Sequence, residues 1–300
     1  MVEKEASPVI QQVLTEQGQG HETRKPLFVE LEKELKRPVV SFFTSFKFPV
    51  MIEDADADML EGVLQKMDLT NGLVLLISSP GGDGLAAERI INICRSYSST
   101  CDYWAIVPGK AKSAATMICF GASKIIMGAS SELGPIDPQI ATSENGVLRR
   151  FSVYNIVESY DDLFARAVKE KGNLQPYLQQ LANYDEREIK EFRAALLLSE
   201  DIAIRTLASG MMKGVAKNRI RKKIEIFLTP KRTKTHERPI YGEEASKCGL
   251  AVELRDVRER FWKEVYQLYI RTNNFVSTKA PKCIESKNHS FVATIRDDKK

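Results

Sequence analysis

Two glycine-rich segments of the sequence carry the residue types that could form an active site. The first, 79–84 (SPGGDG), follows an apolar run, and the second, 108–115 (PGKAKSAA), leads into another. Glycines let the backbone approach a ligand closely and direct amide N–H groups at it, as the oxyanion hole of an acyl-transfer enzyme requires. The first segment lacks the Gly-Lys-Ser/Thr ending of a phosphate-binding loop and the GxGxxG dinucleotide pattern. It therefore predicts stabilisation of an oxyanion rather than nucleotide binding.

Ser113 is the candidate nucleophile, because it lies at the start of the helix predicted after the second segment. A helix N-terminus stabilises developing negative charge, which suits an attacking hydroxyl. A serine in this place can equally be a plain N-cap, the role that we expect for Asp83 in the first segment. Two strand–break–helix units about thirty residues apart are more specific than either one alone.

The segments around these breaks alternate between strand and helix. Strands are predicted over 39–46, 73–77, 103–107 and 124–127, from β-branched and aromatic residues and continuous apolar runs. Apolar residues at helical spacing predict the connecting helices. This alternation predicts an α/β fold with a mostly parallel sheet and right-handed crossovers. The predicted connecting helices are 54–67, 85–97 and 113–120.

After residue 139 the alternation gives way to helical patterns. Helices are predicted over 153–171 and 187–208. A helix over 243–248, ended by Gly249, leads into an edge strand. An amphipathic helix is predicted over 257–269, and the tail from Thr272 has no clear period. We therefore divide the chain into a polar N-terminal arm or peripheral helix (1–36), an α/β domain (37–254) with a helical and basic insertion at about 150–234, and a C-terminal helix and tail (255–300).

Three motifs together resemble one protein family: 78–82 (SSPGG), 109–115 (GKAKSAA) and 132–139 (ELGPIDPQ). They are similar to the serine dehydrogenase proteinase family of the Clp-protease/crotonase superfamily, of which signal peptide peptidase A is another relative. A later match, 238–245 (RPIYGEEA) with 249–252 (GLAV), resembles the closing helix-and-strand unit of that superfamily.

The resemblance implies the ββα superhelix of Clp proteases and crotonases, with a mostly parallel sheet and additional helices. It implies a serine peptidase that forms an acyl-enzyme on Ser113 and needs no cofactor. Backbone N–H groups of Gly81 or Gly82 and of Ala114 would form the oxyanion hole. The partners implied are a protein or peptide substrate and further copies of the chain. Because no ATPase motif is present, we expect the activity to be ATP-independent.

The catalytic base does not follow from the motifs. Where the Clp proteases have a histidine before a Gln-Pro pair, this chain has Asp137 and no histidine. One hypothesis exchanges the roles, with His236 as base and Asp137 as the carboxylate that orients it, because a triad is defined by geometry rather than by order. In relatives with a Ser–Lys dyad the lysine lies on the next helix, which makes Lys169 the first lysine candidate. Lys110 and Lys112 are the other two lysines considered.

Two other function classes stay open. A crotonase-type acyl-CoA enzyme would share the oxyanion hole, but it rarely needs a serine at the helix start. A catalytically inactive assembly protein or nucleic-acid-binding protein would keep the fold without a base.

The composition is that of an ordinary soluble globular protein, with 43% apolar and 28% charged residues in 300. The five cysteines are odd in number and have no C-x-x-C spacing, which argues against disulfides or a metal site and favours a reducing cytosol. The apolar runs are shorter than a membrane span, and the N-terminus lacks an apolar signal core. We therefore expect a cytoplasmic protein without a membrane span.

The charge of the chain is unevenly distributed. The total is +4, from 44 Lys and Arg against 40 Asp and Glu, but residues 211–238 hold ten Lys or Arg and two Glu. That segment alone carries +8, which leaves −4 for the rest. It is the place where an acidic partner or nucleic acid would bind, although a solvated face is the favoured interpretation.

Overall fold

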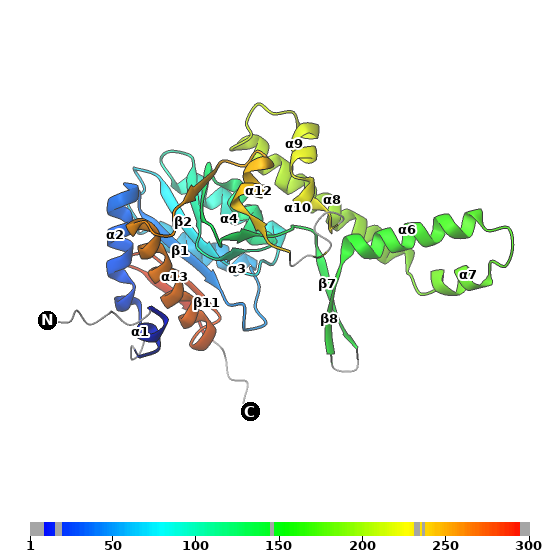
Figure 1. Cartoon of the computed structure of the whole chain (residues 1–300), viewed down its shortest axis with the longest axis horizontal. Helices are drawn as coiled ribbons and strands as arrows, with labels where there is room; N and C mark the ends of the chain where they lie inside the picture. The colour runs from blue at the N-terminus through cyan, green and yellow to red at the C-terminus, as the bar shows by residue number, and fades with distance from the viewer. Residues whose placement is uncertain (1–8, 16–19, 145–146, 231–234, 236–237, 295–300) are drawn as a thin grey trace.

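A seven-stranded sheet in the order β10-β5-β3-β2-β1-β11-β12 forms the centre of the computed structural model, which describes residues 9–15, 20–144, 147–230, 235 and 238–294 (Figure 1). The first five strands of that order run parallel, and β11 and β12 are antiparallel to their neighbours. The predicted α/β class with a mostly parallel sheet is confirmed. The strands are β1 (Val39–Thr44), β2 (Leu73–Ser78), β3 (Tyr103–Val107), β5 (Lys124–Gly128), β10 (Val252–Arg255), β11 (Lys282–Glu285) and β12 (Ser290–Ala293).

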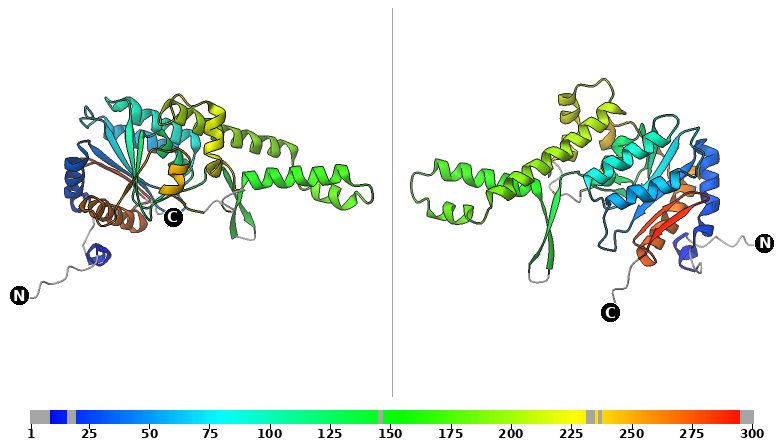
Figure 2. Two further views of the ribbon diagram at one scale, coloured as in Figure 1. Left: turned by 45° about the horizontal axis from the view of Figure 1, so that its top comes forward. Right: turned by 180° about the vertical axis from the view of Figure 1, so that it is seen from behind.

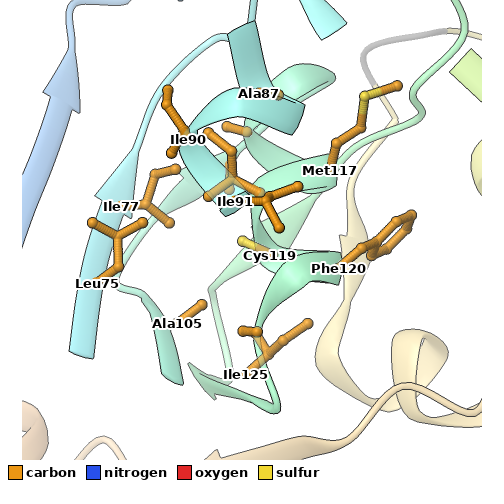
Figure 3. Packing of buried hydrophobic residues seen from close by; sticks show 14 of the residues in the cluster. Leu75, Ile77, Ala87, Ile90, Ile91, Ala105, Met117, Cys119, Phe120 and Ile125 are labelled. Atoms are coloured by element: carbon orange, nitrogen blue, oxygen red, sulfur yellow. The ribbon is translucent and has the colours of Figure 1, made fainter. Parts of the chain in front are cut away.

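Both faces of the sheet are buried, which explains why its strands are apolar without alternation. Along β2, Leu75 and Ile77 face one cluster of buried side chains, whereas Val74 and Leu76 face another. The first cluster includes side chains from α3 (Asp54–Leu64), α4 (Gly84–Tyr97) and α5 (Ala114–Gly121), and Figure 3 shows its packing around α4 and α5. The second cluster is covered by α2 (Lys25–Leu35) and α13 (Arg260–Thr278).

An arm projects from the sheet, and a helical extension of α8 (Glu186–Ser209), α9 (Lys217–Lys223) and α10 (Glu225–Leu228) follows it along the chain. The arm consists of the hairpin of β7 (Gln139–Glu144) and β8 (Val147–Ser152), followed by α6 (Val153–Lys169) and α7 (Gln175–Leu181). Figure 2 shows α6 and α7 pointing away from the sheet in both views. The long α8 returns to the sheet and leads into α9 and α10.

Short elements complete the chain. A small second sheet joins β4 (Lys110–Ala111), β6 (Glu132–Leu133) and β9 (Ile240–Tyr241) beside the carboxyl edge of the main sheet. The closing unit consists of α12 (Gly242–Lys247) and the edge strand β10, as the sequence predicts. The N-terminal elements are α1 (Val9–Thr15) and the 3-10 turn η1 (His21–Thr23).

The two ends of the chain are more structured than their sequences predict. The tail beyond Thr272, expected to lack regular structure, continues α13 to Thr278 and then adds β11 and β12 to the sheet next to β1. Of the two predictions for residues 1–36, the described part supports a helix, because α2 buries Phe28 and Leu31 under the sheet.

Candidate active site

The two glycine-rich loops lie side by side because they follow neighbouring parallel strands, β2 and β3. The Ser79 N–H donates to the Lys110 carbonyl at 3.1 Å, and the Lys112 N–H donates to the Ser79 carbonyl at 3.0 Å. This pairing fixes the first loop against the residues that precede Ser113. In open parallel sheets, ligands bind at this carboxyl edge of the strands.

Ser113 has an unusual backbone conformation, with φ 50° and ψ −119°. It directly precedes α5, yet its side chain makes no capping hydrogen bond. Asp83, at the same position before α4, does act as a cap, because its carboxylate accepts the Leu85 N–H at 2.8 Å. The N-cap interpretation therefore holds for Asp83 and fails for Ser113. Such strain at a serine between a strand and a helix is typical of an exposed nucleophile.

Gly81 is the residue of the first loop that lies against Ser113. Its φ of 102° favours glycine, and a Cβ there would lie 2.7 Å from the Ser113 Cβ and 2.6 Å from the Lys112 carbonyl oxygen. The Gly81 N–H donates to the Ser79 hydroxyl at 3.1 Å. Gly81 therefore provides space beside the serine, and its amide is already in use.

The two remaining amides expected at the oxyanion hole, those of Gly82 and Ala114, have no acceptor among the described residues. Gly82 forms a parallel bridge with Ile52, whose N–H and carbonyl bond to Gly81 and Asp83. The Gly82 N–H is left out of that bridge. The Ala114 N–H belongs to the first turn of α5, where an amide has no partner within the helix. Both residues line the same pocket as Ser113.

That pocket has a volume of about 180 Å³. Met117 and Ile136 supply apolar walls, and Arg150 of β8 and Ser199 of α8 lie on its rim. Two larger cavities share lining residues with it. One, of about 620 Å³, shares Pro80, Gln139 and Arg150, and the other, of about 590 Å³, shares Ile136, Pro138 and Ser199. The pocket of Ser113 therefore adjoins two cavities that have no lining residue in common.

Lys110 and Lys112 both bind one carboxylate, that of Glu132. Their ammonium groups lie 3.2 Å from its two oxygens, Oε1 and Oε2 respectively. The Lys112 ammonium also donates to the Leu133 carbonyl at 3.3 Å. Lys112 is the more buried of the two, with 13% of its side chain exposed against 56% for Lys110.

The other candidate bases are distributed over three places. Asp137 is buried and accepts a hydrogen bond from the Ser152 hydroxyl at 2.7 Å, but it lines the 590 Å³ cavity rather than the pocket of Ser113. His236 lies outside the described residues. Lys169 is exposed at the far end of α6, roughly 24 Å along the helix axis from its start beside Pro138. The structure does not bring Lys169 to Ser113 within one chain.

Arg150 and Glu132 are site residues whose roles the sequence does not indicate. Glu132 is the first residue of the 132–139 motif, but its pairing with two lysines depends on the small sheet in which β4 and β6 are neighbours. Arg150 is the second of two adjacent arginines, and nothing in the sequence shows which of them faces the pocket.

The basic segment is described in part. Its helix α9 exposes five cationic side chains, and one of them, Arg221, pairs with Glu200 of α8 at 2.5 Å. Residues 231–234 and 236–237 lie outside the described residues. The other four exposed cations are Lys217, Arg219, Lys222 and Lys223. Across the described part of the chain, no cluster of three or more His, Cys, Asp or Glu could hold a metal ion, and no helix has the length and apolarity that spanning a membrane requires.

Comparison with known sequences finds a family model that matches part of the chain. Residues 38–165 match the family of ClpP-like SDH-type serine proteinases. Two uncharacterized proteins of Methanocaldococcus jannaschii are relatives. One is 29% identical over 65% of this chain and 56% of that protein, and the other is 30% identical over 38% of this chain and 35% of that protein. The chain thus spans about half or less of the length of these relatives.

Comparison with solved structures finds the 1510-N membrane-bound stomatin-specific protease. A lysine-to-alanine mutant in complex with a substrate peptide is 18% identical, with a TM-score of 0.30 over 74% of this chain and 94% of that one. A serine-to-alanine mutant is 19% identical, with the same TM-score over 42% of this chain and 63% of that one.

Proposed function

Because residues 38–165 match the model of the ClpP-like SDH-type serine proteinases, we propose that this chain is a serine peptidase with Ser113 as its nucleophile. One observation carries the proposal. Ser113 is held at a positive φ without a capping bond, and it lines a pocket together with two uncommitted amides. A crotonase-type enzyme would need the amides but not the strained serine.

The reaction would proceed through an acyl-enzyme. The Ser113 hydroxyl attacks the scissile carbonyl carbon as a base removes its proton, and the Gly82 and Ala114 N–H groups hold the oxyanion. Each such donor contributes about 3–4 kcal/mol to stabilising the transition state. When the C–N bond breaks, the base returns the proton to the leaving amine. Water then repeats the sequence, which releases the acid and restores Ser113.

Two groups compete for the role of base within one chain. Lys112 is adjacent to Ser113 and partly buried, and its ammonium group pairs with Glu132 at 3.2 Å. His236, oriented by Asp137, is the alternative of the exchanged triad. Lys112→Met and His236→Gln separate them, because only loss of the true base should abolish deacylation.

Labelling with a fluorophosphonate probe tests the nucleophile. We expect the wild type to be labelled and Ser113→Ala not to be. Ser199→Ala is the matched control, since it removes the other serine of the pocket and should keep the labelling. Labelling that survives in Ser113→Ala would refute the proposal, and unlabelled wild type would favour the inactive assembly protein.

We also propose a cytoplasmic homo-oligomer. Among the described residues no disulfide joins any of the five cysteines, which supports a reducing compartment. The arm exposes Phe164, Val168 and Leu178, each more than half accessible, and such apolar side chains support contact with further copies. The exposed cations of α9 support an acidic partner at that helix. Sedimentation of the purified chain tests self-association, and the same experiment with added polyanion tests binding of an acidic partner.

A further inference from the structure

The two cavities beside Ser113 differ in charge. The 620 Å³ cavity is lined by three cationic side chains and one carboxylate, those of Lys110, Lys112, Arg150 and Glu132. The 590 Å³ cavity is lined by equal numbers of acidic and basic side chains. Its ionisable lining residues are Asp137, Glu200 and Glu225 against Arg193, Arg221 and Lys222.

The ionisable side chains that line the 620 Å³ cavity have a positive sum of formal charges. The Glu132 carboxylate already lies between the two lysine ammonium groups, at 3.2 Å from each. That cluster of three groups keeps one positive charge, and Arg150 adds a second. The formal charge of the described lining is therefore +2, which would stabilise an anion.

Arg150 differs from the two lysines of this lining in that it has no ion pair with Glu132. It is exposed, and no carboxylate among the described residues forms an ion pair with it. It lines both the 620 Å³ cavity and the pocket of Ser113, so one side chain connects the site of chemistry with the positive cavity. A guanidinium in this place can bind a carboxylate through two parallel hydrogen bonds.

From this asymmetry we infer that Arg150 is a specificity residue that selects peptides with an acidic side chain on the Lys110 side of the scissile bond. The inference rests on the proposed peptidase function. Because Arg150 also lines the pocket of Ser113, the acidic residue would lie close to the scissile bond in the peptide sequence. Phe46 and Pro80 of the same cavity would contact its aliphatic part. On the opposite side, the charge-balanced cavity with Leu196 and Leu197 would accept apolar residues.

The test uses pairs of quenched fluorescent peptides that differ only by Glu or Gln at one position, scanned across the scissile bond. We expect the wild type to cleave the Glu peptide with a kcat/KM roughly ten-fold or more above that of the Gln peptide at one position, mostly through KM. Because exposed charges are screened by salt, the ratio should shrink at high ionic strength. Arg150→Gln should bring it close to one, Arg150→Lys should retain part of it, and Arg150→Glu should favour a Lys peptide.

Arg149→Gln is the matched control, because it removes the neighbouring arginine, which lines neither cavity. It should keep the preference for Glu. Equal cleavage of Glu and Gln peptides by the wild type, or a preference that survives Arg150→Glu, would overturn the inference.

Equilibrium binding separates this inference from the proposed function. Fluorescence anisotropy with Ser113→Ala measures the Kd of the same peptides without any turnover. Tighter binding of the Glu peptide that depends on Arg150 supports the inference even if no peptide is cleaved and no probe labels Ser113. Equal Kd values refute it even if Ser113 proves to be the nucleophile.

Discussion

Ser113 holds a conformation that an L-residue adopts only under constraint, at a cost of about 1–3 kcal/mol. The flanking backbone maintains it. The Ala115 N–H donates to the Lys112 carbonyl at 2.9 Å, and the Met117 N–H donates to the Ser113 carbonyl at 3.1 Å. The opposing wall is Gly81, whose missing side chain leaves room for the serine. The geometry at the nucleophile thus depends on a residue of the other loop.

Gly81→Ala should therefore impair the site directly. Its Cβ would lie 2.6 Å from a backbone oxygen and 2.7 Å from the Ser113 Cβ, so one of the two loops must shift. Since oxyanion stabilisation depends on sub-ångström placement of the donors, we expect the rate of fluorophosphonate labelling to fall roughly 100-fold or more.

Gly214→Ala is the control for this change. Gly214 also has a positive φ, 84°, but nothing lies within 4 Å of its added Cβ. It should lose about 1–2 kcal/mol of stability from backbone strain and keep its labelling rate. If the two variants lose labelling equally, backbone strain alone explains the effect and Gly81 has no special role.

At this scale the sequence predicts residue types better than conformations. The glycines predict an oxyanion hole, and Ser113 is predicted as a nucleophile. Whether Gly81 or Gly82 offers its amide depends on the Ser79 hydroxyl, whose position is set by the pairing of two loops. Arg150 was not predictable because the β7–β8 hairpin, which the sequence does not announce, brings it into the same pocket lining as Pro80.

Among the elements, α2 and β11 are joined by a buried ion pair. The Arg24 guanidinium donates to both oxygens of the Glu285 carboxylate, at 2.6 and 2.7 Å, and both side chains are at most 1% exposed. The Ser290 hydroxyl also donates to this carboxylate at 2.7 Å. Burial opposes ionisation of Glu285, but the hydrogen bonds and charge of Arg24 outweigh it, so its pKa lies below the ordinary value.

Glu285→Gln should destabilise the chain strongly. It removes the charged acceptor of two hydrogen bonds from the buried Arg24 guanidinium, which costs about 3–5 kcal/mol. Because the pKa of Glu285 is lowered on folding, its contribution is present above pH 4.5, the ordinary value, and is lost as the pH falls through the lower folded value. The difference in unfolding free energy between wild type and variant should therefore narrow below about pH 4.5. Urea unfolding at several pH values measures it. A difference that is constant across this range would assign the loss to packing.

The same pair explains why the sequence predicts the central strands and misses β11. The strands β1, β2, β3 and β5 are predicted because their sequences are apolar runs. By contrast, two of the four residues of β11 are the charged Lys282 and Glu285, which ordinarily indicate solvent. They are buried because Asp56 and Arg24, more than 220 positions away in sequence, supply opposite charges. No local pattern encodes such a partner.

On the scale of the whole molecule, the region predicted as an insertion is divided in two. The arm of α6 and α7 stands apart from the sheet (Figure 2), whereas α8, α9 and α10 contribute to the same buried cluster as α4 and α5. The connection runs through Phe227 of α10. Its ring packs edge-on against that of Phe120 in α5 at 5.1 Å, and its carbonyl accepts the Ile136 N–H at 2.7 Å. The helices α8 to α10 therefore support both α5, which follows the nucleophile, and a wall of the pocket.

Phe227→Ala should consequently affect stability and the site together. Truncating a fully buried phenylalanine costs about 3–5 kcal/mol of unfolding free energy. Since Ile136 and α5 both line the pocket of Ser113, we also expect slower probe labelling at a temperature where the variant is still folded. Phe164→Ala removes the same side chain from the arm, where it is 52% exposed, and should change the unfolding free energy by no more than about 0.5 kcal/mol. Unfolding curves and labelling rates of the two variants check this. A folded Phe227→Ala variant that labels at the wild-type rate would show that the active site is built by the sheet alone and that α8 to α10 only cover it.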